Sequence, residues 1–171
     1  MKLLLLIVIL LSASTQVLAV RRQKASFPPD REMRPFATDG CTMAPDGTVN
    51  RPRLFRPCCV AHDLRYWGGG TSLERDRADL ALRACVRELG GPGWATIFYN
   101  GVRAGRLSPW TIAAKRWGNA WYEHDGYRQL SAEELQRLID AVPGLKLPEE
   151  MKALYLSELL ARLPAVTETN P

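Results

Sequence analysis

The chain has 171 residues, a formal net charge of +5 and four cysteines. This length suits one domain with its own hydrophobic core. The basic residues are scattered, without the dense runs and interleaved aromatic residues typical of single-stranded nucleic-acid binders, so we expect no nucleic-acid partner.

Residues 1–19 are typical of an export signal. Lys2 supplies the positive end, residues 3–11 an apolar stretch, and residues 17–19 a small-residue cleavage site. The apolar stretch is about nine residues long, whereas spanning a bilayer takes about 20. We therefore expect a signal peptide and a secreted or periplasmic single domain, residues 20–171, without a transmembrane segment. An uncleaved anchor is the alternative.

The four cysteines predict two disulfides in an exported chain. They lie at Cys41, Cys58, Cys59 and Cys85, which allows three pairings. Zinc binding is the competing use of cysteine and histidine. It is disfavoured because two adjacent cysteines do not easily face one tetrahedral site, and the chain has no C-x-x-C pair.

A pair of antiparallel helices is expected after a loop at 39–56. Pro57 suits the first turn of a helix that runs to about Trp67, where three glycines end it. A second helix begins near Ser72 and closes at Gly90. The turn between them is short, so the two helices should pack side by side.

More helices are expected toward the C-terminus, which makes the fold class mainly α. They are expected at Trp94–Arg103, after Ser108-Pro109, after Ser131 with Glu134 three residues on, and at Pro148–Leu163. The domain would thus have a core at 39–89 and a helical C-terminal extension at 93–164.

Aromatic and apolar residues of these helices are expected in the core rather than at a lipid surface. The aromatic set is Trp67, Trp94, Phe98 and Trp110, and the stripe of the last helix is Met151, Leu154, Tyr155, Leu159 and Leu163.

The first helix of the pair carries the most informative motif, Cys-Cys-Val-Ala-His-Asp-Leu-Arg-Tyr. Cys58, His62 and Tyr66 lie at i, i+4 and i+8 on one face, and Asp63 is turned from them by about 100°. One helix can thus present a base, a disulfide tether, a phenol and a carboxylate suited to a metal ion.

The second helix offers a carboxylate opposite His62. If Asp79 faces His62, then Cys58 and Cys85 lie about 6 and 9 Å further along in the same direction, so a bridge between them would fix this register. Asp76 is the competing partner. Its spacing to Cys85 fits less well.

These residues resemble the secreted phospholipase A2 superfamily, whose hallmark is Cys-Cys-x-x-His-Asp followed by a cysteine and a tyrosine. Arg65 stands where that cysteine is expected. Its usual partner, just before the aspartate of the second helix, is Ala78 here, so both halves of one bridge are absent together. The resemblance covers 39–89 and is closer to bacterial than to animal members.

The resemblance implies a role for each residue of the motif. His62 would be the general base that takes a proton from the attacking water, Asp79 would orient the imidazole, and Tyr66 would hydrogen-bond that aspartate. The reaction would be hydrolysis of a phospholipid acyl ester, at sn-2 by family expectation, on a membrane surface or micelle.

The resemblance also implies Ca²⁺ as cofactor. Asp63 would be a bidentate ligand, joined by the backbone carbonyls of Gly40, Thr42 and Ala44, and Cys41 would pair with Cys59. The loop lacks the glycine run usual in the family and is longer. Asp39, Asp46 or Gly47 are therefore alternative ligands.

Two other functions are compatible with the sequence: a non-catalytic module that binds lipid or protein on the same scaffold, and a cationic protein that disrupts membranes without catalysis. A second His-Asp pair, His124-Asp125, is expected to lie in a turn after an aromatic helix, because no cysteine or second carboxylate accompanies it. Two histidines are too few for a metal-dependent phosphohydrolase built on such pairs.

Overall fold

The computed structural model describes residues 33–105, 117–122 and 126–164. They belong to a unit that runs from Glu32 to Pro171, whereas residues 1–31, which include the predicted signal peptide, lie outside the description. The predicted helix after Ser108-Pro109, Trp110 and the His124-Asp125 turn also lie outside it.

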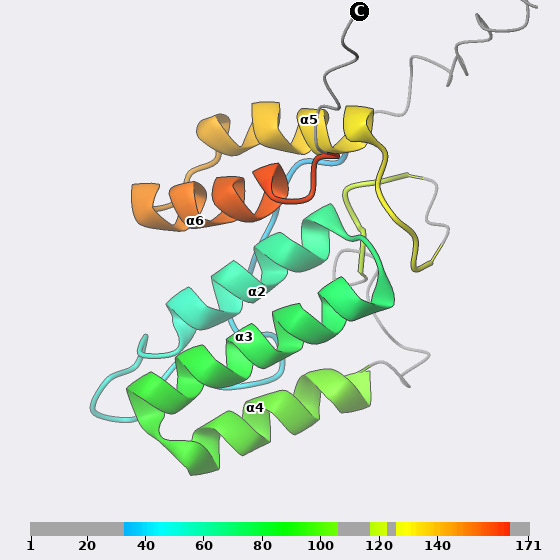
Figure 1. The fold of residues 1–171 in the computed structure, drawn as a ribbon. Coiled ribbons are helices and arrows are strands. Elements are labelled where there is room, and N and C mark those ends of the chain that lie inside the picture. The colour runs from blue at the N-terminus through cyan, green and yellow to red at the C-terminus, as the bar shows by residue number, and fades with distance from the viewer. Residues whose placement is uncertain (1–32, 106–116, 123–125, 165–171) are drawn as a thin grey trace, which may run out of the picture. The chain divides into compact units, whose positions relative to one another are not determined.

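The described part of the chain is mainly helical, as predicted (Figure 1). Its β-structure is limited to two isolated bridges, Met33 with Trp121 and Thr48 with Arg51. The helices are α2 (Arg56–Gly68), α3 (Ser72–Gly90), α4 (Pro92–Gly105), α5 (Ala132–Ala141), the 3-10 helix η3 (Val142–Gly144) and α6 (Glu149–Leu160). The third helix begins two residues earlier than expected, at Pro92, and the last one ends at Leu160 rather than near Leu163.

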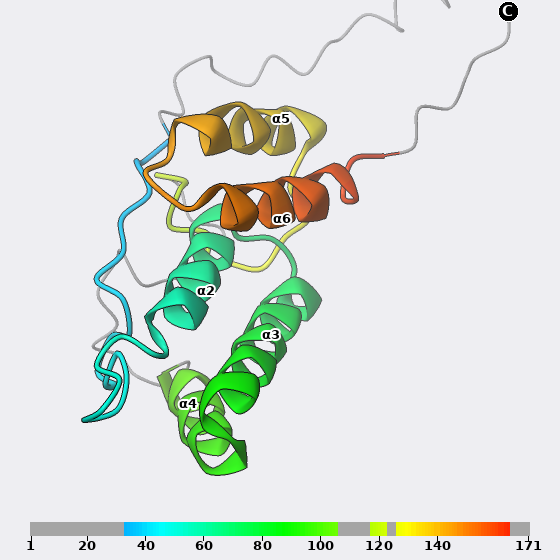
Figure 2. The same cartoon turned by 90° about the vertical axis from the view of Figure 1, so that its left-hand side faces the viewer.

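Helices α2 and α3 lie side by side, joined by a short turn (Figures 1 and 2). A disulfide between Cys58 and Cys85 links them, and a second disulfide joins Cys41 to Cys59, so the loop before α2 is tied to its first turn. Two disulfides were predicted, and these are the pairings expected from the register and from the resemblance.

Three glycines and a capping box make the turn between α2 and α3. Gly69 has a positive φ of 75°, and a methyl group at its Cα would collide with the backbone of Gly118. Thr71 caps α3: its hydroxyl accepts from the Glu74 N–H, and the Glu74 carboxylate accepts from the Thr71 N–H. The short turn therefore depends on Gly69, which lets the backbone of Gly118 come close, and on the cap formed by Thr71 and Glu74.

The segment 117–121 closes the C-terminal end of α2. Backbone N–H groups of Gly118 and Ala120 donate to the carbonyls of Tyr66 and Trp67, at 2.7 and 2.9 Å. The indole N–H of Trp121 donates to Gly68, 2.9 Å away. Helix-end carbonyls that lack intrahelical partners are satisfied in this way, which fixes the helix that carries His62.

Two apolar clusters flank the helix pair. One lies between α2, α3 and α4, where Phe55 is fully buried beside Leu82 and Val86. The other lies between α2, α5 and α6, around Leu138 and Leu159. Trp67 and Phe98 are buried as expected, and Trp94 is partly buried.

The last helix follows the expected stripe except at Leu154, which is 54% exposed. Tyr155 and Leu159 are buried, while Met151 and Leu163 pack against the cluster. Leu154 is one residue ahead of Tyr155 and falls outside the buried face. In the part of the chain that the structure describes, no helix combines the length and hydrophobicity needed to cross a membrane.

Candidate active site

His62 and Asp79 meet between α2 and α3. Nε2 of His62 lies 3.0 Å from Oδ1 of Asp79, and the aspartate is fully buried. Because a carboxylate only accepts, this contact places a proton on Nε2 and leaves Nδ1 with its lone pair. No hydrogen bond to Nδ1 is found among the described residues. The pair can thus orient an imidazole whose other nitrogen can accept a proton.

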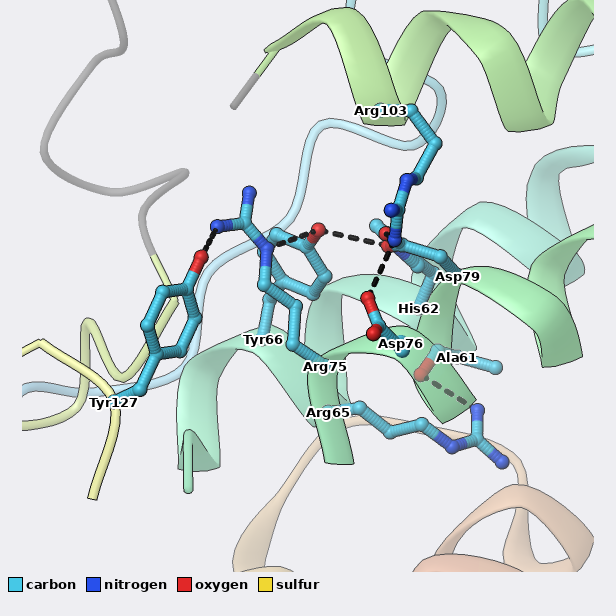
Figure 3. Close-up of polar contacts among 9 residues, drawn as sticks. All are labelled: Ala61, His62, Arg65, Tyr66, Arg75, Asp76, Asp79, Arg103 and Tyr127. Atoms are coloured by element: carbon cyan, nitrogen blue, oxygen red, sulfur yellow. Dashed lines mark hydrogen bonds and ion pairs between the residues drawn. The ribbon is translucent and has the colours of Figure 1, made fainter. Parts of the chain in front are cut away.

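Tyr66 supplies a second donor to the same carboxylate oxygen. Its hydroxyl donates to Oδ1 of Asp79 at 2.8 Å and accepts from Nε of Arg75 at 2.9 Å (Figure 3). Burial raises the pKa of Tyr66 well above its usual value, and the nearby Asp79 charge adds to the increase. The phenol therefore stays protonated and remains a donor to Asp79.

Arginines surround this network in a way that the sequence did not predict. Arg75 reaches the Tyr127 hydroxyl through Nη1, and Arg103 of α4 lies 3.9 Å from Oδ2 of Asp79 (Figure 3). A buried anion needs compensating charge and donors, and these cations supply part of it. Neither arginine falls in the 58–66 motif, and Arg103 is 24 residues from Asp79 in sequence, so no local spacing pointed to it.

Asp76, the competing partner of His62, instead pairs with Arg103 at 2.5 Å. Asp76 lies three positions before Asp79 on α3, but only Asp79 hydrogen-bonds His62. The structure thus places the two carboxylates in different contacts, one with the imidazole and one with the guanidinium of α4.

Asp63 lies half-buried at the side of the helix pair. Its Oδ2 accepts a hydrogen bond from the Thr38 hydroxyl at 2.7 Å. Thr38 also accepts from the N–H of Gly40, which ties the start of the loop to this carboxylate. Thr38 was not singled out in the sequence, because a single threonine in a loop gives no signal.

The loop itself is built around Asp46 and Arg56. Oδ1 of Asp46 accepts from the Cys41 N–H at 2.8 Å, and Oδ2 pairs with Arg56 at 2.7 Å. The hydrogen bond from Cys41 and the charge of Arg56 hold the pKa of Asp46 below its usual value. Arg56 also donates to the Asp39 carbonyl. Asp39 and Asp46, the alternative ligands, are thus engaged in the internal structure of the loop.

The carbonyls predicted as calcium ligands lie in this loop. Within the described parts of the chain, those of Gly40, Thr42 and Ala44 accept no backbone hydrogen bond, whereas the Cys41 carbonyl accepts one from Ala44. Among the described residues no three His, Cys, Asp or Glu side chains form a metal cluster. A hard cation at this place would depend on one carboxylate, Asp63, and on neutral oxygens, a donor set that suits Ca²⁺.

A scan against models of protein families, a search of curated proteins and a search of solved structures each found no significant match to this chain. The resemblance to phospholipase A2 therefore depends on the residues of the motif and stays a prediction.

Proposed function

We propose that this protein is a phospholipase A2-like hydrolase that cleaves a phospholipid acyl ester with water activated by His62 and Asp79. The observation that supports this most is the buried hydrogen bond between Nε2 of His62 and Oδ1 of Asp79, with Nδ1 left to act as a base. An imidazole with one nitrogen held by a carboxylate and the other keeping its lone pair is the side chain used most often as a general base.

In the proposed reaction, a water on the Nδ1 side of His62 attacks the ester carbonyl and gives its proton to that nitrogen. The resulting imidazolium is stabilised by Asp79, which Tyr66 and Arg103 hold in place as an anion. When the tetrahedral intermediate collapses, the acyl C–O bond breaks and the proton passes from Nδ1 to the leaving oxygen. The products are a fatty acid and a lysophospholipid.

The residues around Asp63 would hold the cofactor. Asp63 and the carbonyls of Gly40, Thr42 and Ala44 would bind Ca²⁺, which when bound would polarise the ester carbonyl and offset the negative charge of the intermediate. The hydrogen bond from Thr38 would keep the Asp63 carboxylate oriented toward the loop. The protein would be exported and act on a membrane or micelle, as the leader sequence and the substrate class suggest.

The test is calcium-dependent release of fatty acid from mixed phospholipid vesicles, measured by mass spectrometry. His62→Gln should lower the rate at least about 100-fold, because it removes the general base. Arg87→Gln, at an exposed position of α3, is the matched control and should be unchanged. Release that survives a chelator would contradict the role of calcium, and release by His62→Gln at the normal rate would contradict the base.

A second candidate is a non-catalytic lipid-binding module. The observation in its favour is that loop oxygens of Asp39 and Asp46 are already bonded to Thr42, Cys41 and Arg56. Such a module would bind the same vesicles in a sedimentation assay, with or without calcium, and would release no fatty acid. The two candidates thus differ in turnover as well as in their need for the ion.

A further inference from the structure

A cavity of about 420 Å³ lies between α2, α3 and α6, apart from the candidate active site. None of His62, Asp63, Tyr66 and Asp79 lines it. Its volume falls in the range of roughly 300–1,000 Å³ that is usual for small-molecule sites. It is therefore large enough to hold a ligand of its own.

Small and aromatic side chains form the apolar part of this cavity. Ala78 and Ala81 come from α3 and Ala161 follows α6, beside the rings of Trp117 and Tyr155. Trp117 is fixed by a 2.7 Å hydrogen bond from its indole N–H to the carbonyl of Gly70. Alanines at three places leave open the space that larger side chains would fill.

Tyr155 contributes its ring to this wall, while its hydroxyl is buried behind the wall, against Gly68. The side chain is buried, and its hydroxyl has no hydrogen-bond partner among the residues that are described. Burial raises the pKa of Tyr155 above its usual value, so the hydroxyl remains a donor. Its oxygen has almost no exposed surface, so the hydroxyl does not face a ligand in the cavity.

Three arginines stand around the cavity, and two of them are already paired. Arg65 binds Glu158 through Nε and Nη2, at 2.9 and 2.5 Å. Arg162 pairs with Glu74 at 2.6 Å. Arg77 is exposed and makes no ion pair within the described ranges. The cavity thus combines an apolar wall with one unneutralised positive charge.

The cavity occupies a place where this chain departs from the phospholipase A2 pattern. Arg65 and Ala78, the two positions at which a bridge of the superfamily is missing, both line it. The ion pair from Arg65 to Glu158 brings α6 against the helix pair there. Residues of α2, α3 and the C-terminal helix thus enclose the space together.

We propose that this cavity binds a single-chain amphiphile with a carboxylate head, its alkyl chain against Ala81 and Trp117 and its carboxylate on Arg77. A guanidinium without an ion-pair partner favours an anionic oxygen ligand, and the apolar wall favours a hydrocarbon chain. Binding here does not depend on hydrolysis at His62.

The test is calorimetric titration of octanoate, below its micelle concentration, into the His62→Gln protein with a chelator present. This variant separates the proposal from the proposed hydrolysis, because binding is measured where no turnover occurs. Octanoate should bind, and adding Arg77→Gln should weaken its binding about tenfold while binding of uncharged octanol stays the same. Arg87→Gln, on the same helix but outside the cavity, should have no effect.

A second test fills the cavity with a larger side chain. Ala81→Phe should abolish the binding of both octanoate and octanol, and Ala161→Phe, at an exposed position, should do the same if the first variant does not fold. Octanoate that fails to bind, or that binds equally well to Arg77→Gln and to the filled variants, would overturn the proposal. Octyl phosphate binding more than about tenfold tighter than octanoate would overturn the assignment to a carboxylate.

Discussion

The α2–α3 pair and the α5–α6 pair are stabilised by different means. A disulfide and a buried polar network of Asp79, His62 and Tyr66 join α2 to α3. Helices α5 and α6 contain no cysteine and meet α2 through apolar contacts around Leu138 and through the ion pair from Arg65 to Glu158. The pair that carries the candidate active site is thus covalently fixed, whereas the C-terminal pair depends on packing.

Among the changes that test this difference, removing the disulfide between α2 and α3 should have the largest effect on stability. Replacing Cys58 and Cys85 together by alanine should lower the free energy of unfolding by about 2–5 kcal/mol, because the unfolded chain gains freedom. Urea unfolding followed by circular dichroism measures the change. The proposed hydrolysis should fall as well, since the register of His62 and Asp79 is no longer fixed. A variant with full stability would show that packing alone aligns the helices.

A cavity created by mutation in the apolar cluster of α5 and α6 should destabilise the protein without abolishing its activity. Leu138→Ala, at a fully buried position of α5, should cost about 2–4 kcal/mol in urea unfolding. The fatty-acid release per folded molecule should stay near normal, because Leu138 belongs to the apolar cluster around α5 and α6 and not to the hydrogen-bonded network of His62 and Asp79. A loss of activity as large as that of the disulfide variant would contradict the separation of the two regions.

The ion pair between the regions should contribute a smaller amount. Arg65 is 18% and Glu158 36% exposed in their side chains, so solvent screens part of their attraction. A double-mutant cycle with Arg65→Met and Glu158→Gln should give a coupling energy of about 1 kcal/mol. Gln136 and Asp140, which form an exposed 2.9 Å hydrogen bond on α5, provide a comparison pair with a smaller coupling of about 0.2–0.5 kcal/mol.

The smallest of the four effects is the contribution of Glu134 to the free energy of unfolding, which depends on pH. Burial alone would raise the pKa of Glu134, but hydrogen bonds from Arg128 and from the Ser131 N–H outweigh it and hold the pKa below the ordinary value of 4.5. Its ionised form therefore stabilises the fold above that value, and the contribution is lost as the pH falls through the lower folded pKa.

Glu134→Gln keeps the capping residue type and removes the charge. It should be less stable than the wild type at about pH 7, and the gap should close at about pH 3. Urea unfolding at the two pH values measures this. A gap that is constant with pH would contradict the role of the charge.

The sequence predicted much of the helix pair and less of what surrounds it. The positions of Pro57, the glycines at 68–70 and Gly90 mark the ends of the two helices, and the spacing of Cys58, His62, Asp79 and Cys85 is sufficient to set their register. These are local signals. The pairing of Arg65 with Glu158, 93 residues apart, leaves no such local trace.

The surroundings of the candidate site were predicted least well for the same reason. Arg103 reaches Asp79 from a different helix, and Thr38 reaches Asp63 from a loop. An arginine or a threonine is common on any surface, so its residue type gives no indication of the carboxylate it contacts. Only the packing of α4 and the path of the loop place these two residues.

The most direct test of the central claim is hydrolysis of phospholipid vesicles in water labelled with ¹⁸O. If water activated by His62 attacks the acyl carbonyl, the wild-type protein should release fatty acid that carries one label, with an unlabelled lysophospholipid, and His62→Gln should release almost none. Labelled fatty acid produced equally by both proteins, or by neither, would contradict the account.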